Sequence, residues 1–199
     1  MLKHDLITQI HDSINNLDGR KIAFVLEGRD ASGKGGFIKE LIRYDIPFTY
    51  VHAGMPTPSE MKNWLSTWKK RMPNNNEIVV FDRSWHTRSW VHPVYNYCTK
   101  RQYNNHISRV ADWENSQNVE IYKNWISISK VQEKEVLENR KIFKRWKYSE
   151  SDKLAIENFD LITDYKNIMF KKCPTWNIVD KNVSKKKLLL HFANTLKPL

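Results

Sequence analysis

Ten residues, EGRDASGKGG at positions 27–36, carry the clearest chemical signal in this chain. They contain the Walker A spacing GxxxxGK and come directly after the apolar run KIAFVL. In such a loop the backbone N–H groups converge on phosphate oxygens, the lysine reaches the terminal phosphates, and the next helix directs its positive end at them. The sequence therefore predicts a ligand that ends in phosphate. The candidate phosphate-binding residues are Gly28, Arg29, Ser32, Gly33, Lys34, Gly35 and Gly36.

Two acidic residues are candidates for holding a metal ion. Gly35 replaces the Ser or Thr hydroxyl that usually contacts Mg²⁺, so a metal would need another oxygen. Asp30 lies inside the loop, where its carboxylate would repel phosphate unless a divalent cation lay between them. Asp82 follows the apolar residues IVVF, the position of a Walker B aspartate at a strand end; capping a turn is its alternative role. We interpret Asp30 and Asp82 as ligands for Mg²⁺, with Mn²⁺ as the alternative.

Basic residues near these motifs could neutralise phosphate charge. Arg83 and Arg88 follow Asp82 closely, and either could instead be a structural ion-pair partner. The segment RKIFKRWK at 140–147 has five cations and no acid. Such a run is usually a solvated face, but its position after the fourth apolar run favours a lid, at about 139–150, that closes over the transferring phosphate. The catalytic candidates are Asp30, Lys34, Asp82, Arg83, Arg88 and Arg140, with Lys144 and Arg145 as further phosphate-binding residues.

The elements that must position these residues follow an alternating pattern. Short apolar runs occur at 21–26, 47–53, 77–81, 121–128 and 175–179. Helix-like stretches occur at 4–16, from 33, at 59–71, from 99, at 131–140, up to 170, and from 184. Ser129 and Gln132 predict a capping box before the stretch at 131–140. This alternation is typical of a parallel sheet covered by helices, and nothing divides residues 1–199 into separate domains.

The composition limits the partners and the location. A net charge of +11 and a pI near 9.6 favour a strongly anionic partner, which could be nucleic acid, an anionic membrane or a phosphate-rich substrate. The two cysteines, Cys98 and Cys173, indicate neither a disulfide framework nor a zinc site. Without a signal peptide or an apolar run long enough to span a membrane, we expect a cytoplasmic protein with no membrane partner.

Several motifs, in order, resemble the polyphosphate kinase 2 family from about residue 21 to the C-terminus. EGRDASGKGG is similar to that family's EGRDAAGKGG, and FDRSW at 81–85 is similar to FDRSWYNR, with His86 and Thr87 departing. VHPVYNYCT resembles VEPVMGFCT, with His92 in place of Glu. KNWISISKVQEKEVLENR resembles KFWLHISKEEQ, with Ser127 where His is usual, and KRWKYSESD resembles KRWKLSPSD in the lid region.

The resemblance implies a particular fold and reaction. The fold would be a three-layer α/β/α, P-loop kinase-like structure with a five-stranded parallel sheet and a helical lid. The reaction would be reversible, Mg²⁺-dependent phosphoryl transfer between inorganic polyphosphate and nucleoside mono- or diphosphates, from ADP or AMP to ATP or ADP. The partners would be polyphosphate and nucleotides, and we also expect a homo-oligomer.

The residues alone reach only as far as phosphoryl transfer, so two alternatives stay open. One is an ATP-dependent kinase of a nucleotide or another small molecule. The other is a non-catalytic nucleic-acid-binding P-loop protein, which the charge and the aromatic content favour. Trp64 and Trp68 lie at helical spacing, where core packing is the more usual role of aromatic residues, so we expect no nucleic-acid partner.

Overall fold

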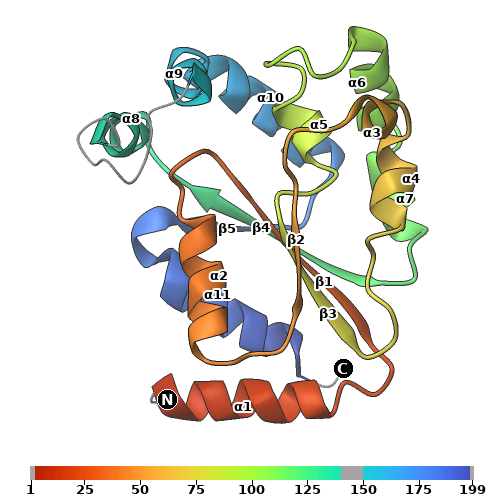
Figure 1. The fold of residues 1–199 in the computed structure, drawn as a ribbon, viewed down its shortest axis with the longest axis vertical. Coiled ribbons are helices and arrows are strands. Elements are labelled where there is room, and N and C mark those ends of the chain that lie inside the picture. The colour runs from red at the N-terminus through yellow and green to blue at the C-terminus, as the bar shows by residue number, and fades with distance from the viewer. Residues whose placement is uncertain (1–2, 140–149, 198–199) are drawn as a thin grey trace.

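A sheet of parallel strands forms the centre of the molecule in this computed structural model, which describes residues 3–139 and 150–197 (Figure 1). Its five strands lie in the order β2-β3-β1-β4-β5. Their bounds are β1 (Lys21–Gly28), β2 (Thr49–His52), β3 (Glu77–Asp82), β4 (Glu120–Ser127) and β5 (Trp176–Asp180). Every neighbouring pair is parallel, so the predicted sheet is confirmed.

Helices cover both faces of this sheet, as Figure 1 shows. They are α1 (Lys3–Asn15), α2 (Lys34–Arg43), α3 (Pro58–Lys62), α4 (Trp64–Lys69), α5 (Thr87–Trp90), α6 (Lys100–Ile107), α7 (Val110–Asn115), α8 (Lys130–Asn139), α9 (Glu150–Glu157), α10 (Phe159–Lys172) and α11 (Ser184–Thr195). A short 3-10 helix, η1 (Lys181–Val183), precedes α11. The three-layer α/β/α arrangement predicted from the sequence is therefore confirmed.

The alternation of side chains along β1 explains the two helical layers. Ile22, Phe24 and Leu26 pack into a core with α1, α2 and α11 on one face. Ala23 and Val25 point to the other face, where the indoles of α4 and of Trp85, which follows β3, cover them. Because β1 is buried on both faces, its sequence is a continuous apolar run, as is usual for a central parallel strand.

Some helices end earlier than the sequence pattern predicts. The stretch predicted at 59–71 divides into α3 and α4 at Asn63, and the long amphipathic stretch up to 170 divides into α9 and α10 at Asn158. Helix α5 was not predicted. The capping box of Ser129 and Gln132 is confirmed, because each side chain bonds the other residue's backbone N–H. Most of the predicted lid, residues 140–149, lies outside the described residues.

The topology brings the loops that follow β1, β2, β3 and β4 to one edge of the sheet. In parallel strands all carboxyl ends lie at the same edge, which is where open α/β sheets bind ligands. The first three of these loops contain the glycine motif, the segment 53–57 and the residues after Asp82. Within the described residues, no helix combines the length and the apolar character that crossing a membrane requires.

Candidate active site

The glycine loop joins β1 to α2 through a turn that only glycine can make at its first position. Gly28 has a φ of 148°, and a Cβ added there would lie 2.6 Å from the carbonyl oxygen of Ile126 in β4. Gly33 also has a positive φ, of 109°. These positions let the chain reverse beside the neighbouring strand, so the loop closes tightly over the end of the sheet.

The beginning of α2 offers backbone donors to an anion. Gly33 is its N-cap and supplies no side chain to bond the exposed N–H groups of the first turn. Such groups and the helix dipole form a site for phosphate. The hydroxyl of Ser32 is buried and has no hydrogen-bond partner among the residues described, so it can donate to a ligand as well. Gly35, the second residue of α2, is exposed, and a Cβ added there would meet open space in the described part of the chain.

Lys34 lies buried over the loop that precedes it. Its Nζ donates to the carbonyl oxygens of Gly28 at 2.8 Å and Arg29 at 3.1 Å. Burial lowers the pKa of Lys34 from 10.5 to about 8, and Arg83 adds to this effect, while Asp82, Asp30 and Glu27 oppose it. The ammonium is therefore poorly solvated and close to three carboxylates, and anionic phosphate would favour its charged form.

Asp82 ends β3 and has one carboxylate oxygen suited to a metal ion. The Tyr50 hydroxyl donates to its Oδ2 at 3.2 Å, and His52 Nδ1 lies 3.4 Å from the same oxygen. Its Oδ1 is buried and has no partner in the described part of the chain. Over residues 3–139 and 150–197, no three His, Cys, Asp or Glu form a metal cluster. A hard cation such as Mg²⁺ commonly uses one or two carboxylates together with substrate phosphates, and Asp82 fits that requirement.

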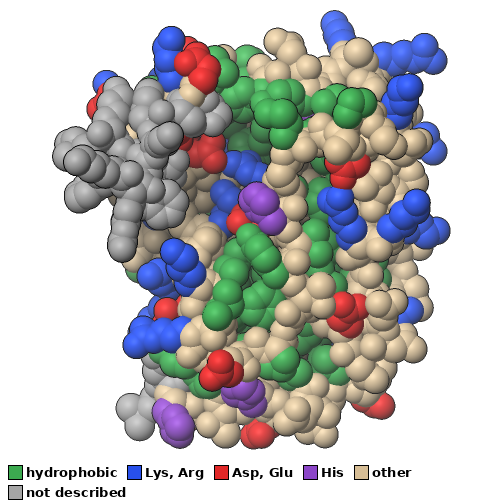
Figure 2. Space-filling model, in the orientation of Figure 1, with side chains coloured by type: hydrophobic (Ala, Val, Ile, Leu, Met, Phe, Trp, Pro, Cys, Tyr) green, Lys and Arg blue, Asp and Glu red, His purple; other side chains and the backbone are tan. Residues whose placement is uncertain are grey.

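Asp30 forms an ion pair with Arg83 across the loop. Arg83 donates from Nη2 to Asp30 Oδ1 at 2.7 Å, and its guanidinium lies 5.2 Å from the centre of the Trp90 ring. Arg83 also has a φ of 65°, which is uncommon for a residue with a side chain and often marks a functional position. The predicted residues Asp30, Lys34, Asp82 and Arg83 therefore gather at one point. Figure 2 shows basic, acidic and histidine side chains together near the middle of the face in view.

Glu27 belongs to this group but was missed in the sequence. It ends the apolar run of β1, is fully buried, and accepts hydrogen bonds from the backbone N–H and hydroxyl of Ser84, both at 2.8 Å, and from Trp90 Nε1 at 3.1 Å. Burial raises the pKa of Glu27, and nearby Arg83 opposes that shift. Its carboxylate fixes the chain after β3 against the glycine loop. The available signal was a charged residue inside an otherwise apolar strand.

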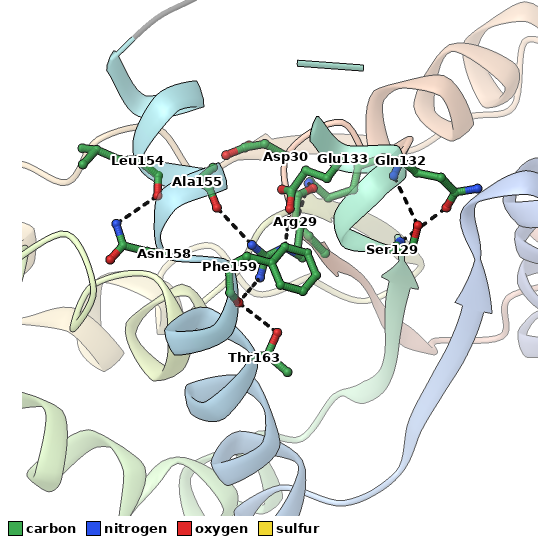
Figure 3. Close-up of polar contacts among 12 residues, drawn as sticks. Arg29, Asp30, Ser129, Gln132, Glu133, Leu154, Ala155, Asn158, Phe159 and Thr163 are labelled. Carbon is green, nitrogen blue, oxygen red and sulfur yellow. Dashed lines mark hydrogen bonds and ion pairs between the residues drawn. The ribbon is translucent and has the colours of Figure 1, made fainter. Parts of the chain in front are cut away.

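Two predicted residues point elsewhere. The Arg29 guanidinium, predicted to bind phosphate, instead contacts Glu133 and two helix carbonyls, as Figure 3 shows. Arg88 donates to the Met61 carbonyl oxygen at 2.9 Å and lies 4.7 Å from the centre of the Trp64 ring, at the border of a separate cavity. Its guanidinium, which the sequence predicted would offset phosphate charge, contacts α3 and α4 in this structure. Arg140, Lys144 and Arg145 lie outside the described residues.

A cavity of about 330 Å³ opens beside Asp30 and Arg83. Its walls come from the end of β2 and the segment after it, from α5 and from the residues that follow α5: His52, Ala53, Gly54, Met55, Pro56, Thr87, Val91, His92, Tyr95 and Tyr97. Burial, with Arg88 and Arg83 nearby, lowers the pKa of His92 to about 3, so this imidazole stays neutral. The cavity therefore combines an ion pair at one end with neutral aromatic and aliphatic walls.

A second hollow, the lysine groove, runs on the other side of the glycine loop. It has a volume of about 790 Å³ and is bordered by Gly33 and Gly36 of the loop. Its remaining walls come from η1 and α11: Lys181, Asn182, Val183, Ser184, Lys185, Lys186, Lys187 and Leu190. Lys185 lies directly over Gly36, where an added Cβ would come within 3.1 Å of its Cε. Among the described residues, four lysines and no acid line this groove, which suits a polyanion.

Comparison with known proteins agrees with this geometry. A family model described as polyphosphate kinase 2 matches residues 2–197. The NDP-polyphosphate phosphotransferase 2 of Ruegeria pomeroyi is 30% identical over 193 residues, covering 89% of this chain and 56% of that protein. The GDP-polyphosphate phosphotransferase of Mycolicibacterium smegmatis is 30% identical over 180 residues, covering 84% of this chain and 64% of that protein. This chain spans less than two thirds of either relative.

A solved structure has the same fold. The crystal structure of polyphosphate kinase 2 from Arthrobacter aurescens TC1 superimposes with a TM-score of 0.81 at 22% identity, over 97% of this chain and 74% of that one. At this identity the likeness shows the fold alone. It confirms the expected P-loop kinase-like arrangement of the sheet and its helices.

Proposed function

This chain belongs to the polyphosphate kinase 2 family, and we propose that it transfers phosphoryl groups between inorganic polyphosphate and a nucleoside mono- or diphosphate. The observation that carries the proposal is the position of the glycine loop between two different hollows. The lysine groove on one side suits a long polyanion, and the cavity beside Asp30 and Arg83 on the other has aromatic walls suited to a nucleotide. Lys34 belongs to the loop that borders both hollows, and it would contact a phosphoryl group that passes from one ligand to the other.

The chemistry asks little of the protein beyond position and charge. An attacking nucleotide phosphate is already ionised near neutral pH, so no strong general base is needed. The loop N–H groups and Lys34 would hold the transferring phosphoryl group, and Arg83 would offset the negative charge that develops on it. Because one phosphoanhydride replaces another, the direction should follow the substrate concentrations.

A divalent metal ion fits the same site. We propose that Asp30 and Asp82 hold Mg²⁺, with Mn²⁺ as the alternative; Asp82 would use its Oδ1, which has no partner within residues 3–139 and 150–197. When bound, such an ion would neutralise phosphate charge and orient the phosphate oxygens. Asp30 already pairs with Arg83, so we expect this ion pair to rearrange when the metal binds.

The direct test is an assay with defined phosphate donors. The purified protein is incubated with Mg²⁺, a panel of nucleoside mono- and diphosphates, and either polyphosphate or ATP as the only donor, and the products are separated by chromatography. Polyphosphate-dependent formation of di- or triphosphates is expected. Transfer from ATP alone would favour an ATP-dependent kinase of a nucleotide or another small molecule. A gel shift of nucleic acid without any phosphoryl transfer would favour a non-catalytic nucleic-acid-binding protein. The panel also decides between adenine and guanine nucleotides.

The homo-oligomer and the cytoplasmic location stay predictions.

We expect the pH profile of kcat/KM for polyphosphate to fall above about pH 8. The free enzyme must have Lys34 charged to bind phosphate, and burial sets its pKa at about 8. Bound phosphate favours the ammonium, so the corresponding limb of kcat should lie at higher pH. The measurement is an initial-rate profile at constant ionic strength. Lys34→Arg, which keeps its charge, serves as the comparison: if it shares the wild-type alkaline limb, another group titrates there.

The lysine groove predicts a salt-dependent effect of charge removal. Lys185→Gln combined with Lys186→Gln should raise the KM for long polyphosphate by about tenfold or more at low salt, because fewer counterions are released on binding. The salt dependence of that KM should become shallower, while the KM for the nucleotide stays unchanged. Lys171→Gln with Lys172→Gln, on α10 in the opposite helical layer, removes the same charge and is the control. Equal effects of the two pairs would contradict a polyphosphate track in the groove.

A further inference from the structure

We propose that Arg29 is a positioning residue for phosphoryl transfer: its guanidinium holds the glycine loop to α8, α9 and α10 and so fixes the carbonyl that supports Lys34. This inference rests on the proposed function and assigns a role to a residue that the sequence motif suggested was a phosphate ligand. The residues that Arg29 contacts in these three helices lie more than 100 residues from it in the sequence.

The contacts of Arg29 are numerous and buried. Its Nε donates to Glu133 Oε2 at 2.6 Å, its Nη1 to the Phe159 carbonyl oxygen at 3.1 Å, and its Nη2 to the Ala155 carbonyl oxygen at 3.1 Å (Figure 3). The guanidinium also lies 3.7 Å from the centre of the Phe159 ring. The side chains of Arg29 and Glu133 are only 6% and 1% exposed. A planar, multidentate group is suited to joining several acceptors at fixed angles.

At the junction of α9 and α10, Arg29 serves as a helix cap. Helix α9 ends at Glu157, and its last carbonyl groups have no partner within the helix. The Ala155 carbonyl oxygen accepts from Arg29, whereas the Leu154 carbonyl oxygen accepts from the backbone N–H and the side chain of Asn158, both at 2.9 Å. A cation is favourable at this negative end of a helix. The predicted long helix therefore divides at Asn158, and Arg29 of the glycine loop binds at this division.

At α8, the partner of Arg29 is held by the start of a helix. Glu133 lies in the first turn of α8, where the helix dipole favours a carboxylate. The capping box of Ser129 and Gln132 fixes that turn just after the end of β4. Glu133 therefore has a defined position relative to the sheet, and Arg29 transmits that position to the loop.

The backbone of Arg29 carries this constraint to the reacting centre. Its carbonyl oxygen accepts from Lys34 Nζ at 3.1 Å and from the Ser32 N–H at 3.3 Å, and the next residue is Asp30. The three helices fix the guanidinium of Arg29, and the backbone of Arg29 thus holds the groups proposed to bind phosphate and metal. A misplacement of about 1 Å at such a centre can lower a rate about 100-fold.

The test replaces Arg29 by Met, which keeps much of the side-chain length without the donors. We expect kcat with saturating polyphosphate and nucleotide to fall by about 100-fold, because the reacting groups are displaced rather than the ligands lost. Arg29→Lys keeps the charge and one ion-pair contact but not the fork, so it should recover part of the rate. A rise in the KM for polyphosphate at unchanged kcat would instead make Arg29 a phosphate ligand and overturn the proposal.

Arg20 provides a matched control at the opposite end of β1. Its guanidinium also pairs with a glutamate, Glu120, at 2.7 Å and donates to three carbonyl oxygens near the end of α11. Arg20→Met removes the same kind of contacts far from the loop. We expect it to lower the stability of the fold while kcat stays within about twofold, since contacts far from the active site act on folding and not on the reacting groups. Equal losses of kcat in the two variants would reduce Arg29 to a general structural role.

A double variant separates positioning from the penalty of an unpaired charge. Arg29→Met leaves the Glu133 carboxylate buried without its partner, which is strongly destabilising, whereas replacing both members of a buried pair with apolar groups is often neutral. In Arg29→Met/Glu133→Leu we therefore expect the melting temperature to recover while kcat stays low. Recovery of kcat together with the melting temperature would overturn the proposal.

Hydrogen exchange tests the coupling without any activity. In the ligand-free protein, Arg29→Met should increase amide exchange both in the loop at 28–36 and in the segment 150–162, because one side chain holds the two together. Arg20→Met should leave both segments unchanged. If the wild type transfers no phosphate but this pattern appears, the proposed function fails and the coupling stands. If only the loop exchanges faster, the coupling itself is wrong.

Discussion

Replacing Lys34 by Met should abolish most phosphoryl transfer, with kcat lower by about 1,000-fold or more. Lys34 is a buried cation of the glycine loop that borders the two hollows, and we propose that its ammonium follows the charge on the transferring phosphate. Methionine has a similar length and shape, so the loss would report the charge and not a cavity. The measurement is the initial rate with saturating polyphosphate and nucleotide.

The fold should survive this change. The ammonium is desolvated, so its removal relieves an unfavourable burial, while Asp30, Asp82 and Glu27 lose a compensating charge. These effects oppose each other, and we expect the melting temperature to stay within about 5 °C of the wild type. Lys39→Met, on the exposed side of the same helix, is the control for general effects of charge. More than a tenth of wild-type turnover in Lys34→Met would remove the lysine from the mechanism.

The parts of this site that follow from local backbone geometry were predictable from the sequence. The spacing of Gly28, Gly33 and Lys34 specifies a turn whose shape depends on the residues within it. The place of Asp82 follows from the apolar run before it, because a buried parallel strand delivers its last residue to the binding edge. The order of strands and helices along the chain follows from the same kind of local pattern.

The direction of a side chain depends on partners that are distant in sequence. Arg29 stands inside a phosphate-loop motif, and nothing near it indicates that Glu133, 104 residues away, will pair with its guanidinium. Glu27 was overlooked for the same reason, since its partner Ser84 is 57 residues away. Charged residues beside a phosphate loop look alike in sequence whether they bind the ligand or hold the loop in place.

The departures from the family motifs acquire a physical meaning only in the structure. Thr87 and His92 both line the cavity beside Asp30, and both are buried. His92 replaces the acid of the family motif with a ring that stays neutral, so this wall of the cavity lacks a negative charge. His86 lies away from the cavity, with Nε2 2.6 Å from Glu114 Oε1 in a buried pair. The first two positions are therefore where nucleotide preference could differ from that of the relatives.

Gly28→Ala should destabilise the protein more than any other single change in the loop. The new Cβ would lie 2.6 Å from the Ile126 carbonyl oxygen and 2.8 Å from the Ser32 hydroxyl, and the φ of 148° is itself unfavourable for alanine. Strain and overpacking together predict a loss of roughly 3 to 5 kcal/mol in the free energy of unfolding. For a domain of this size that loss lowers the melting temperature by about 10 °C.

Gly35→Ala is the matched control, because it adds the same methyl group seven residues along the motif. Apart from its chain neighbours and the backbone of its own helix, no heavy atom of the described residues lies within 4 Å of a Cβ at Gly35, the second residue of α2. Alanine favours helix over glycine, so a gain of about 0.5 to 1 kcal/mol is expected there. Urea unfolding of the two variants measures both effects. If Gly28→Ala were as stable as Gly35→Ala, the close approach of the loop to β4 would be wrong, and with it the position of every group in the loop that we propose binds phosphate.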